Sequence, residues 1–310
     1  MKAVRYHAYG DTDVLAYEDA DRPTAGAGEV VVRVAGTTYS PVDTAIRAGF
    51  LRDVFPLVFP HIPSFDLAGV VTEVGQGVSG WNVGDSVVAF LPMNQPGAAA
   101  EYAIAPAEAL AHAPRNVALA DAAALPSTGL TAWQSLFEHA DLKSGQTVLI
   151  NGAGGAVGGY AVQLARQAGA TVTATASPRS IDRLRSYGAD QIVEHTVTPL
   201  AQAVAGQQFD VVLNLAPTSP EETAALVDLV ADGGAFVSTT TPGPDNPGRN
   251  VRTVRVFVHS DAAQLGGLVA KVDAGDLQID VAQRRPLADL AAVHNEAAAG
   301  QLPGKTVLIP

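Results

Sequence analysis

A loop of small residues offers the clearest chemistry in this sequence. It runs from Asn151 to Gly158 and follows Thr147–Ile150, four residues suited to a buried strand. The expected ligand-binding residues of the loop are Ala153, Gly155, Ala156, Val157 and Gly158. Three of them have the Ala-x-Gly-x-x-Gly spacing of a dinucleotide-binding fingerprint, with alanine in place of its first glycine. Unpaired N–H groups and the dipole of the following helix would then hold a diphosphate.

The elements around the loop support this interpretation. From Val157 onward, apolar residues recur at the spacing of one helix face, and Gly169 stands where a left-handed cap would end the helix. A second strand, Thr171–Ala176, begins at about the right distance for a dinucleotide-binding unit. Close packing of a helix on a sheet without any ligand is the alternative. The context favours a dinucleotide site.

The residues after the second strand indicate which dinucleotide is bound. An Asp or Glu there would bind the ribose 2′-hydroxyl of NAD and repel a 2′-phosphate. The chain instead has Ser177, Pro178 and Arg179, and a hydroxyl and a guanidinium suit a phosphate. Ser177 and Pro178 are also typical of a helix start, and Arg179 of a solvated surface charge. We predict NADPH as the cofactor, with His195 at the rim of its pocket or, alternatively, facing solvent.

Two patterns of secondary structure divide the chain. Its first part reads as short strands separated by Gly and Pro, expected at Val30–Val34, Gly69–Val74, Ser86–Phe90 and Glu101–Ala105. This pattern predicts an irregular antiparallel β-barrel. Strands then alternate with helices, which predicts a doubly wound parallel sheet. These strands are expected at Thr147–Ile150, Thr171–Ala176, Gln191–Glu194, Asp210–Leu215, Ala235–Ser238 and Val254–Val258.

The ends of this second region carry further signals. Ser219 followed by Pro220 and Glu222 has the residues of an N-cap, a first-turn proline and a capping box. The last part of the chain predicts helices near Leu265–Asp273 and Leu287–Ala299 and a closing strand at Lys305–Ile309. We expect this part to return to the first domain. The fold class is therefore α/β, with one domain formed by residues 1–121 and 266–310 and the other by residues 122–265.

Composition and charge exclude several classes of protein. The 310 residues are 47% hydrophobic and 16% charged, as expected of a folded globular chain with room for two domains. A net charge of −12 argues against nucleic acid and anionic membranes as partners. The absence of cysteine excludes disulfides and thiolate metal ligands. Because the chain also has no apolar leader or membrane-length apolar run, we expect a cytoplasmic protein.

Short motifs run through nearly the whole chain. They are Met1-Lys-Ala-Val-Arg, Pro41-Val-Asp43, Arg47-Ala-Gly49, Phe65-Asp-Leu-Ala-Gly69, Gly84-Asp85, Ala100-Glu-Tyr102, Ala123-Ala-Leu-Pro126, Gly129-Leu-Thr-Ala132, Asn151 to Gly158, and Gly304-Lys-Thr-Val-Leu308. By their order and spacing, the chain resembles the zinc-independent quinone oxidoreductase branch of the medium-chain dehydrogenase/reductase superfamily. The resemblance implies a GroES-like catalytic domain and a Rossmann NADPH-binding domain. It also implies NADPH-dependent reduction of quinones or activated alkenes, and a homodimer or larger oligomer.

Two positions separate this chain from the zinc-dependent relatives. Those relatives have a Cys where Ser40 stands and a Gly-His-Glu where Ser64-Phe65-Asp66 stands. Serine and phenylalanine do not replace a thiolate and an imidazole around Zn²⁺, and the seven histidines show no metal-binding pair spacing. We expect no metal. A zinc alcohol dehydrogenase is the weaker alternative, which one bound zinc per chain would revive.

Hydride transfer from a nicotinamide to a quinone or an enone fits a site without a Lewis acid, because the substrate delocalises the developing negative charge. The protein then supplies orientation, apolar walls and a hydrogen-bond donor. Tyr39 and Ser40 are the predicted substrate contacts; Tyr39 is alternatively packed core, and many relatives have Asn at the Ser40 position. We expect Asp43 to cap backbone N–H groups. The apolar loop 50–59 is predicted either to wall the substrate pocket or to pack in the core.

Three further residues are expected near the nicotinamide half of the cofactor. The resemblance places Thr131 there, and Ser238 and Thr239 follow the fifth strand of the parallel sheet, where ligands of such sheets bind. A second class of function stays open, an NADPH-binding redox sensor or structural protein with little turnover. The strand at Val254–Val258 is expected at the edge of the sheet, where pairing with a second copy would form a homodimer.

Overall fold

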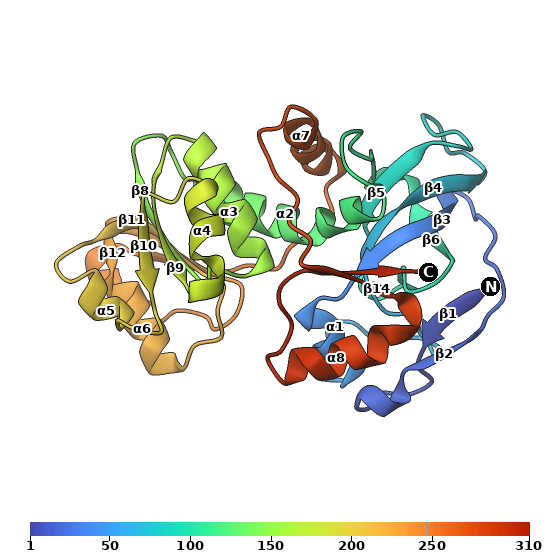
Figure 1. The fold of residues 1–310 in the computed structure, drawn as a ribbon, viewed down its shortest axis with the longest axis horizontal. Coiled ribbons are helices and arrows are strands. Elements are labelled where there is room, and N and C mark those ends of the chain that lie inside the picture. The colour runs from blue at the N-terminus through green and yellow to red at the C-terminus, as the bar shows by residue number, and fades with distance from the viewer. Residues whose placement is uncertain (246) are drawn as a thin grey trace. The chain divides into compact units, whose positions relative to one another are not determined.

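The computed structural model describes residues 1–245 and 247–310 and divides the chain into two compact units (Figure 1). Unit 1 comprises Met1–Ser127 and Ser260–Pro310, and unit 2 comprises Thr128–His259. Helix α2 (Pro126–Trp133) begins at the end of the first segment of unit 1 and continues into unit 2. Among the described residues, no helix is long and apolar enough to cross a membrane.

Unit 1 is built on a mixed sheet with the strand order β14-β15-β3-β4-β5-β7, in which β6 also pairs with β3. Its strands are β3 (Glu29–Thr38), β4 (Asp66–Val74), β5 (Ser86–Phe90), β6 (Tyr102–Pro106), β7 (Leu110–His112), β14 (Gln283–Pro286) and β15 (Thr306–Ile309). The strands of the first segment pair antiparallel, as predicted. The β14–β15 pair is parallel, which the sequence analysis did not predict.

The other elements of unit 1 lie outside this sheet. They are the antiparallel pair β1 (Lys2–Arg5) and β2 (Ala16–Asp19) and the helices α1 (Pro41–Arg47), α7 (Ala262–Asp273) and α8 (Leu290–Ala298). Helix α7 begins three residues before its predicted start. The predicted helix at Leu287–Ala299 is a 3₁₀ turn, Leu287–Asp289, followed by α8. Pro286 is the N-cap of the turn and Asp289 is the N-cap of α8.

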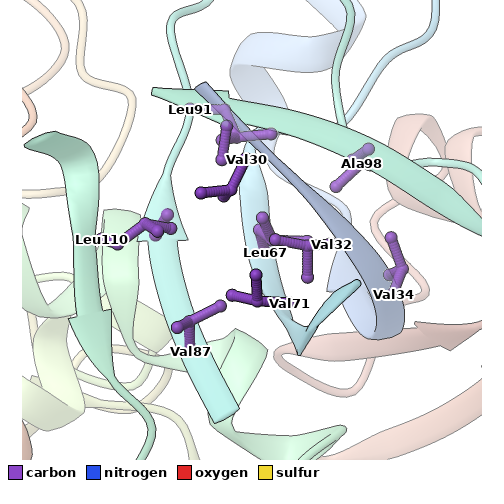
Figure 2. Packing of buried hydrophobic residues seen from close by; sticks show 12 residues of the cluster. Val30, Val32, Val34, Leu67, Val71, Val87, Leu91, Ala98 and Leu110 are labelled. Atoms are coloured by element: carbon purple, nitrogen blue, oxygen red, sulfur yellow. The ribbon is translucent and has the colours of Figure 1, made fainter. Parts of the chain in front are cut away.

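The core of unit 1 follows from alternation along its strands. Val30, Val32 and Val34 occupy every second position of β3 and point to one face, where they meet Leu67 and Val71 of β4 (Figure 2). Each fully buried Val or Leu side chain contributes about 1.5–3 kcal/mol to folding. This packing gives the carboxyl end of β3 and the start of β4 a rigid support, and the polar residues described below lie there.

Unit 2 contains a six-stranded parallel sheet with the order β10-β9-β8-β11-β12-β13. The strands are β8 (Thr147–Asn151), β9 (Thr171–Ala176), β10 (Gln191–Glu194), β11 (Phe209–Asn214), β12 (Val230–Ser238) and β13 (Arg252–Arg255). Numbered within the unit, this order is 3-2-1-4-5-6, that of a doubly wound dinucleotide-binding fold. It confirms the predicted fold class. The order reverses between β8 and β11, where ligands of such sheets bind.

Among the described residues, four α-helices connect these strands. They are α3 (Ala156–Gln167), α4 (Ile181–Ser186), α5 (Leu200–Ala203) and α6 (Pro220–Asp228), with α3 and α4 on one side of the strands in Figure 1 and α5 and α6 on the other. The last strand, β13, ends at Arg255 rather than at the predicted Val258. It lies at the edge of the described sheet, as expected.

Candidate functional site

The glycine loop joins β8 to α3 at the reversal point of the parallel sheet. Gly152 has a φ of +83°, a conformation that glycine adopts without steric cost, and its N–H donates to Thr175 Oγ1 at 2.8 Å. Gly155 is the N-cap of α3, and no side chain of the described residues caps this helix. The N–H groups of its first turn therefore keep the unpaired donors and the positive dipole end that a diphosphate needs.

Close packing also requires the last glycine of the fingerprint. A Cβ atom built on Gly158 would lie 2.4 Å from both the Cα and the carbonyl oxygen of Ala153, so only glycine lets α3 approach the loop this closely. A Cβ on Gly154 would lie 2.7 Å from Ser180 Oγ, and the Gly154 carbonyl accepts a hydrogen bond from Arg183 Nη2 at 2.6 Å. Both close packing and an anion-binding geometry are therefore present in the same loop.

The residues predicted to contact the 2′-phosphate come together at the end of β9. Ser177 is half-buried, and Arg179 is exposed in the 3₁₀ turn that follows. The N–H of His195 donates to the Ala176 carbonyl at 3.2 Å, which places this exposed histidine beside the same turn. Because β9 is the parallel neighbour of β8, the turn and the glycine loop both lie at the carboxyl end of the strands.

The carboxyl ends of the central strands carry a network that sequence analysis missed. Asn214, the fully buried last residue of β11, donates from Nδ2 to Thr218 Oγ1 at 3.0 Å, Thr240 Oγ1 at 3.3 Å and Ser238 Oγ at 3.4 Å. Its Oδ1 accepts from Asn151 Nδ2 at 2.9 Å. The sequence signal that could have revealed this network is an asparagine at the end of each of two adjacent parallel strands, β8 and β11.

The three residues predicted near the nicotinamide differ in their relation to this network. Ser238 is fully buried within it, and its Oγ accepts a hydrogen bond from the Thr240 N–H at 3.2 Å. Thr239 is half-buried, and its N–H donates to the Asn214 carbonyl at 3.1 Å. Thr131 is half-buried in α2.

In unit 1, Tyr39 is packed into an apolar cluster. Its ring meets the His294 ring edge-on, with centroids 4.7 Å apart, and its hydroxyl pairs with Thr44 Oγ1 at 2.9 Å. Burial raises the pKa of Tyr39. The structure thus gives Tyr39 the core packing that was the alternative to a substrate contact.

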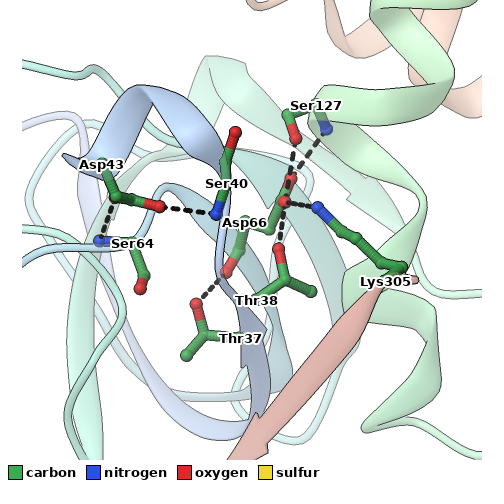
Figure 3. A network of polar contacts seen from close by, with 8 residues as sticks. All are labelled: Thr37, Thr38, Ser40, Asp43, Ser64, Asp66, Ser127 and Lys305. Atoms are coloured by element: carbon green, nitrogen blue, oxygen red, sulfur yellow. Dashed lines mark hydrogen bonds and ion pairs between the residues drawn. The ribbon is translucent and has the colours of Figure 1, made fainter. Parts of the chain in front are cut away.

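Ser40 caps the start of α1, next to Asp43. The Asp43 carboxylate accepts from the N–H of Ser40 at 2.8 Å and from the N–H of Ser64 at 3.0 Å (Figure 3). Complete burial raises the pKa of Asp43 to about 7, against the lowering effect of these two hydrogen bonds. The predicted capping role of Asp43 is confirmed, and Ser40, half-buried, keeps its hydroxyl near the helix start.

Ser64 has a strained backbone. It is fully buried with a φ of +71°, in the position that glycine occupies in the Gly-His-Glu of zinc-dependent relatives. Its hydroxyl has no hydrogen-bond partner among the described residues. A left-handed conformation costs a residue with a Cβ roughly 1–2 kcal/mol.

Ser64→Gly is therefore expected to raise the free energy of unfolding by about 1 kcal/mol, measured by urea denaturation. Ser64→Ala is the control, because it removes the hydroxyl and keeps the Cβ. Equal stabilisation by both variants would assign the effect to the buried hydroxyl, and no gain in Ser64→Gly would show that the backbone is unstrained.

The apolar loop 50–59 is partly buried and partly exposed. Phe50 and Val58 are 83% and 84% exposed, whereas Phe55, Leu57 and Phe59 are half-buried. The loop therefore presents part of its apolar surface outward and packs the rest on unit 1.

His294 makes the stability of unit 1 depend on pH. It is 1% exposed, and burial, with a smaller contribution from Arg47, lowers its pKa to about 3. The unfolded chain takes up this proton below pH 6.5 while the folded chain stays neutral. The stabilising contribution is thus complete above that pH and is lost as the pH falls toward 3.

We expect the difference in unfolding free energy between wild type and His294→Leu to fall by about 1.4 kcal/mol for each pH unit below 6.5. Val293→Ala is the matched control, because it removes buried apolar volume from the same helix without changing a titratable group. Denaturation curves at several pH values measure the difference. A constant difference for His294→Leu, like that of Val293→Ala, would show that His294 titrates normally.

The residues at the zinc positions of related enzymes form no metal-binding set. Within residues 1–245 and 247–310, no group of three or more His, Cys, Asp or Glu side chains could hold a metal ion. Asp66, at the place of the zinc-site glutamate, pairs instead with Lys305 Nζ at 2.9 Å.

Comparisons with known proteins agree with this architecture. Residues 26–115 match the family model described as alcohol dehydrogenase GroES-like domain, and residues 187–308 match the one described as zinc-binding dehydrogenase. A chloroplast envelope quinone oxidoreductase homolog from Arabidopsis thaliana is 33% identical over 100% of this chain and 98% of its own length. A 2-methylene-furan-3-one reductase from Solanum lycopersicum is 32% identical over 100% of this chain and 79% of its own length. The structure of the quinone oxidoreductase from Coxiella burnetii superposes with a TM-score of 0.89 at 26% identity, covering 100% of this chain and 99% of that one.

Proposed function

The chain belongs to the medium-chain dehydrogenase/reductase superfamily, with quinone oxidoreductases among its relatives, and on this basis we propose that it is an NADPH-dependent oxidoreductase. It transfers a hydride to a quinone or an α,β-unsaturated carbonyl and uses no metal ion. The relatives support oxidoreductase chemistry with a nicotinamide cofactor. NADPH and the substrate class are the specific proposals.

The glycine loop is the observation that carries the proposal. Its uncapped helix start, held close to the loop by the packing of Gly158 against Ala153, suits a dinucleotide diphosphate. At the end of β9, the hydroxyl of Ser177 and the guanidinium of Arg179 bind the 2′-phosphate of NADPH, with His195 at the rim. Thr131 and Thr239 approach the nicotinamide, and Asn214 fixes the network that contains Ser238. In this assignment residues 122–265 bind the cofactor and residues 1–121 with 266–310 bind the substrate.

The donor set argues for a substrate that needs no Lewis acid. Ser40, Ser64 and Phe65 are poor zinc ligands, and Asp66 is already paired with Lys305. When bound, NADPH supplies the hydride. A quinone or enone spreads the resulting negative charge onto its carbonyl oxygen, where one hydrogen-bond donor is enough to stabilise it. Since the Tyr39 hydroxyl pairs with Thr44, Ser40 is the donor we assign to this oxygen.

Relatives of both substrate classes support this assignment. One carries the name of a quinone oxidoreductase homolog and another that of a reductase of an activated alkene, 2-methylene-furan-3-one. The homodimer and the cytoplasmic location stay predictions; β13 at the sheet edge is the segment on which the dimer would form.

The proposal is tested by following nicotinamide absorbance with purified protein, NADPH, and a panel of quinones and enones. We expect NADPH oxidation at a rate that a metal chelator does not lower. Tight NADPH binding with no turnover of any panel member would overturn the catalytic assignment and favour the redox-sensor alternative. Loss of activity with the chelator, restored by zinc, would overturn the metal-free assignment.

A further inference from the structure

A buried ion pair joins two distant parts of unit 1. Asp66 is the first residue of β4, and Lys305 immediately precedes β15, 239 residues later. The Lys305 ammonium lies 2.9 Å from Asp66 Oδ2, and the two side chains are only 5% and 2% exposed. Moving two charged groups out of water costs free energy. Their mutual attraction offsets this cost only where further hydrogen bonds satisfy both groups.

Those further hydrogen bonds come from two other segments (Figure 3). Asp66 Oδ1 accepts from the Ser127 N–H at 2.7 Å, and Oδ2 accepts from Ser127 Oγ at 2.8 Å and from Thr38 Oγ1. The Asp66 carbonyl accepts from Thr37 Oγ1 at 2.6 Å. One carboxylate thus ties together the end of β3, the start of α2 and the start of β15.

The tied segments lead directly to residues of the proposed site. Thr38 is followed in the chain by Tyr39 and then by Ser40, the residue assigned to the substrate carbonyl. Ser127 lies in the first turn of α2, and Thr131, assigned to the nicotinamide, follows one helical turn later. A carboxylate at the N-terminus of α2 also interacts favourably with the helix dipole.

We propose that Asp66 and Lys305 are positioning residues for hydride transfer: their buried ion pair fixes the Thr38–Ser40 segment of unit 1, from which Ser40 donates to the substrate carbonyl. This inference rests on the proposed function. Neither side chain touches substrate in this account. Their contribution reaches the reaction through the placement of Ser40.

The test compares Lys305→Met and Asp66→Asn with Arg284→Met. The control removes an ion pair of similar length, 2.6 Å to Asp121, whose arginine is half-exposed at the surface of the same unit. The readouts are the single-turnover rate of NADPH oxidation per cofactor site and the Kd of NADPH. Counting sites by NADPH titration removes the effect of any unfolded protein.

For Lys305→Met and Asp66→Asn we expect the single-turnover rate to fall about 10- to 100-fold, since misplacement by 1 Å costs that much. The Kd of NADPH should change less than about threefold, because the diphosphate loop is untouched. The double variant should lose no more than the worse single variant, since the residues act as a unit. Lys305→Arg, which keeps the charge, should recover part of the rate, and Arg284→Met should match wild type.

Each alternative result has a separate meaning. Folded variants with the wild-type rate per site overturn the inference and leave the proposed function standing. A wild-type protein that reduces no quinone or enone overturns the proposed function instead. If the charge variants do not fold, Thr38→Val and Ser127→Ala each remove one donor and leave the ion pair intact. We then expect rates about 3- to 10-fold below wild type, and wild-type rates in both overturn the inference.

Discussion

Gly158→Ala is expected to weaken NADPH binding about 10- to 100-fold, the effect of 1–3 kcal/mol of overpacking transmitted to the diphosphate loop. The added methyl would lie 2.4 Å from the backbone of Ala153. Neither α3 nor the loop can move away without displacing the N–H groups that bind the diphosphate. Fluorescence titration with NADPH measures the Kd.

Gly267→Ala supplies the control for this substitution. Gly267 lies within α7, and a Cβ built there meets no atom within 4 Å, so alanine should leave the Kd unchanged. Circular dichroism establishes that both variants are folded. A folded Gly158→Ala protein that binds NADPH as tightly as wild type would show that the cofactor does not use this loop.

Arg179→Ala is expected to raise the Kd of NADPH about 10- to 100-fold and to change the Kd of NADH by less than about twofold, because only NADPH offers a phosphate to the guanidinium. Arg179 is exposed and has no ion pair among the described residues, so its removal should not disturb the fold. Isothermal titration with both nucleotides provides the two constants.

Arg185→Ala is the matched control in the same segment. Arg185 pairs with Asp182 at 3.3 Å in α4 and is assigned no contact with the cofactor. It should leave both constants near their wild-type values. Equal weakening of NADPH and NADH in Arg179→Ala would remove Arg179 from the 2′-phosphate site, and no weakening of either would mark it as a solvated surface charge.

Local sequence patterns predicted most of the fold because the responsible interactions are local. Alternation of strands and helices after Thr147 predicted the doubly wound sheet, and the Ser219–Glu222 capping box is present at the start of α6. The bounds of the last strands were less accurate. β12 begins at Val230 because its pairing with β11 continues across a register shift, and the Asp232-Gly233-Gly234 sequence hid this extension.

Candidate site residues could be predicted only where they lie close together in the sequence with a characteristic spacing. The glycine loop and Ser177–Arg179 were predicted in this way, and their binding roles stay predictions. The Asp66–Lys305 pair could not be predicted, because 239 residues separate its partners and only the folded sheet brings them together. The parallel pairing of β14 with β15 was missed for another reason, because no strand was predicted at Gln283–Pro286. Tyr39 showed a further limit, since a tyrosine predicted to contact the substrate fits core packing equally well until its partners are known.

The proposed hydride transfer is tested most directly by single turnover with NADPH deuterated at C4 of the nicotinamide and an α,β-unsaturated ketone. Mass spectrometry of the reduced product locates the label. Our account predicts one deuterium at the β-carbon from the labelled cofactor, and none at that carbon when unlabelled NADPH is used in deuterated water. A reduced product whose β-carbon takes its hydrogen from water, or the absence of any reduced product, would contradict it.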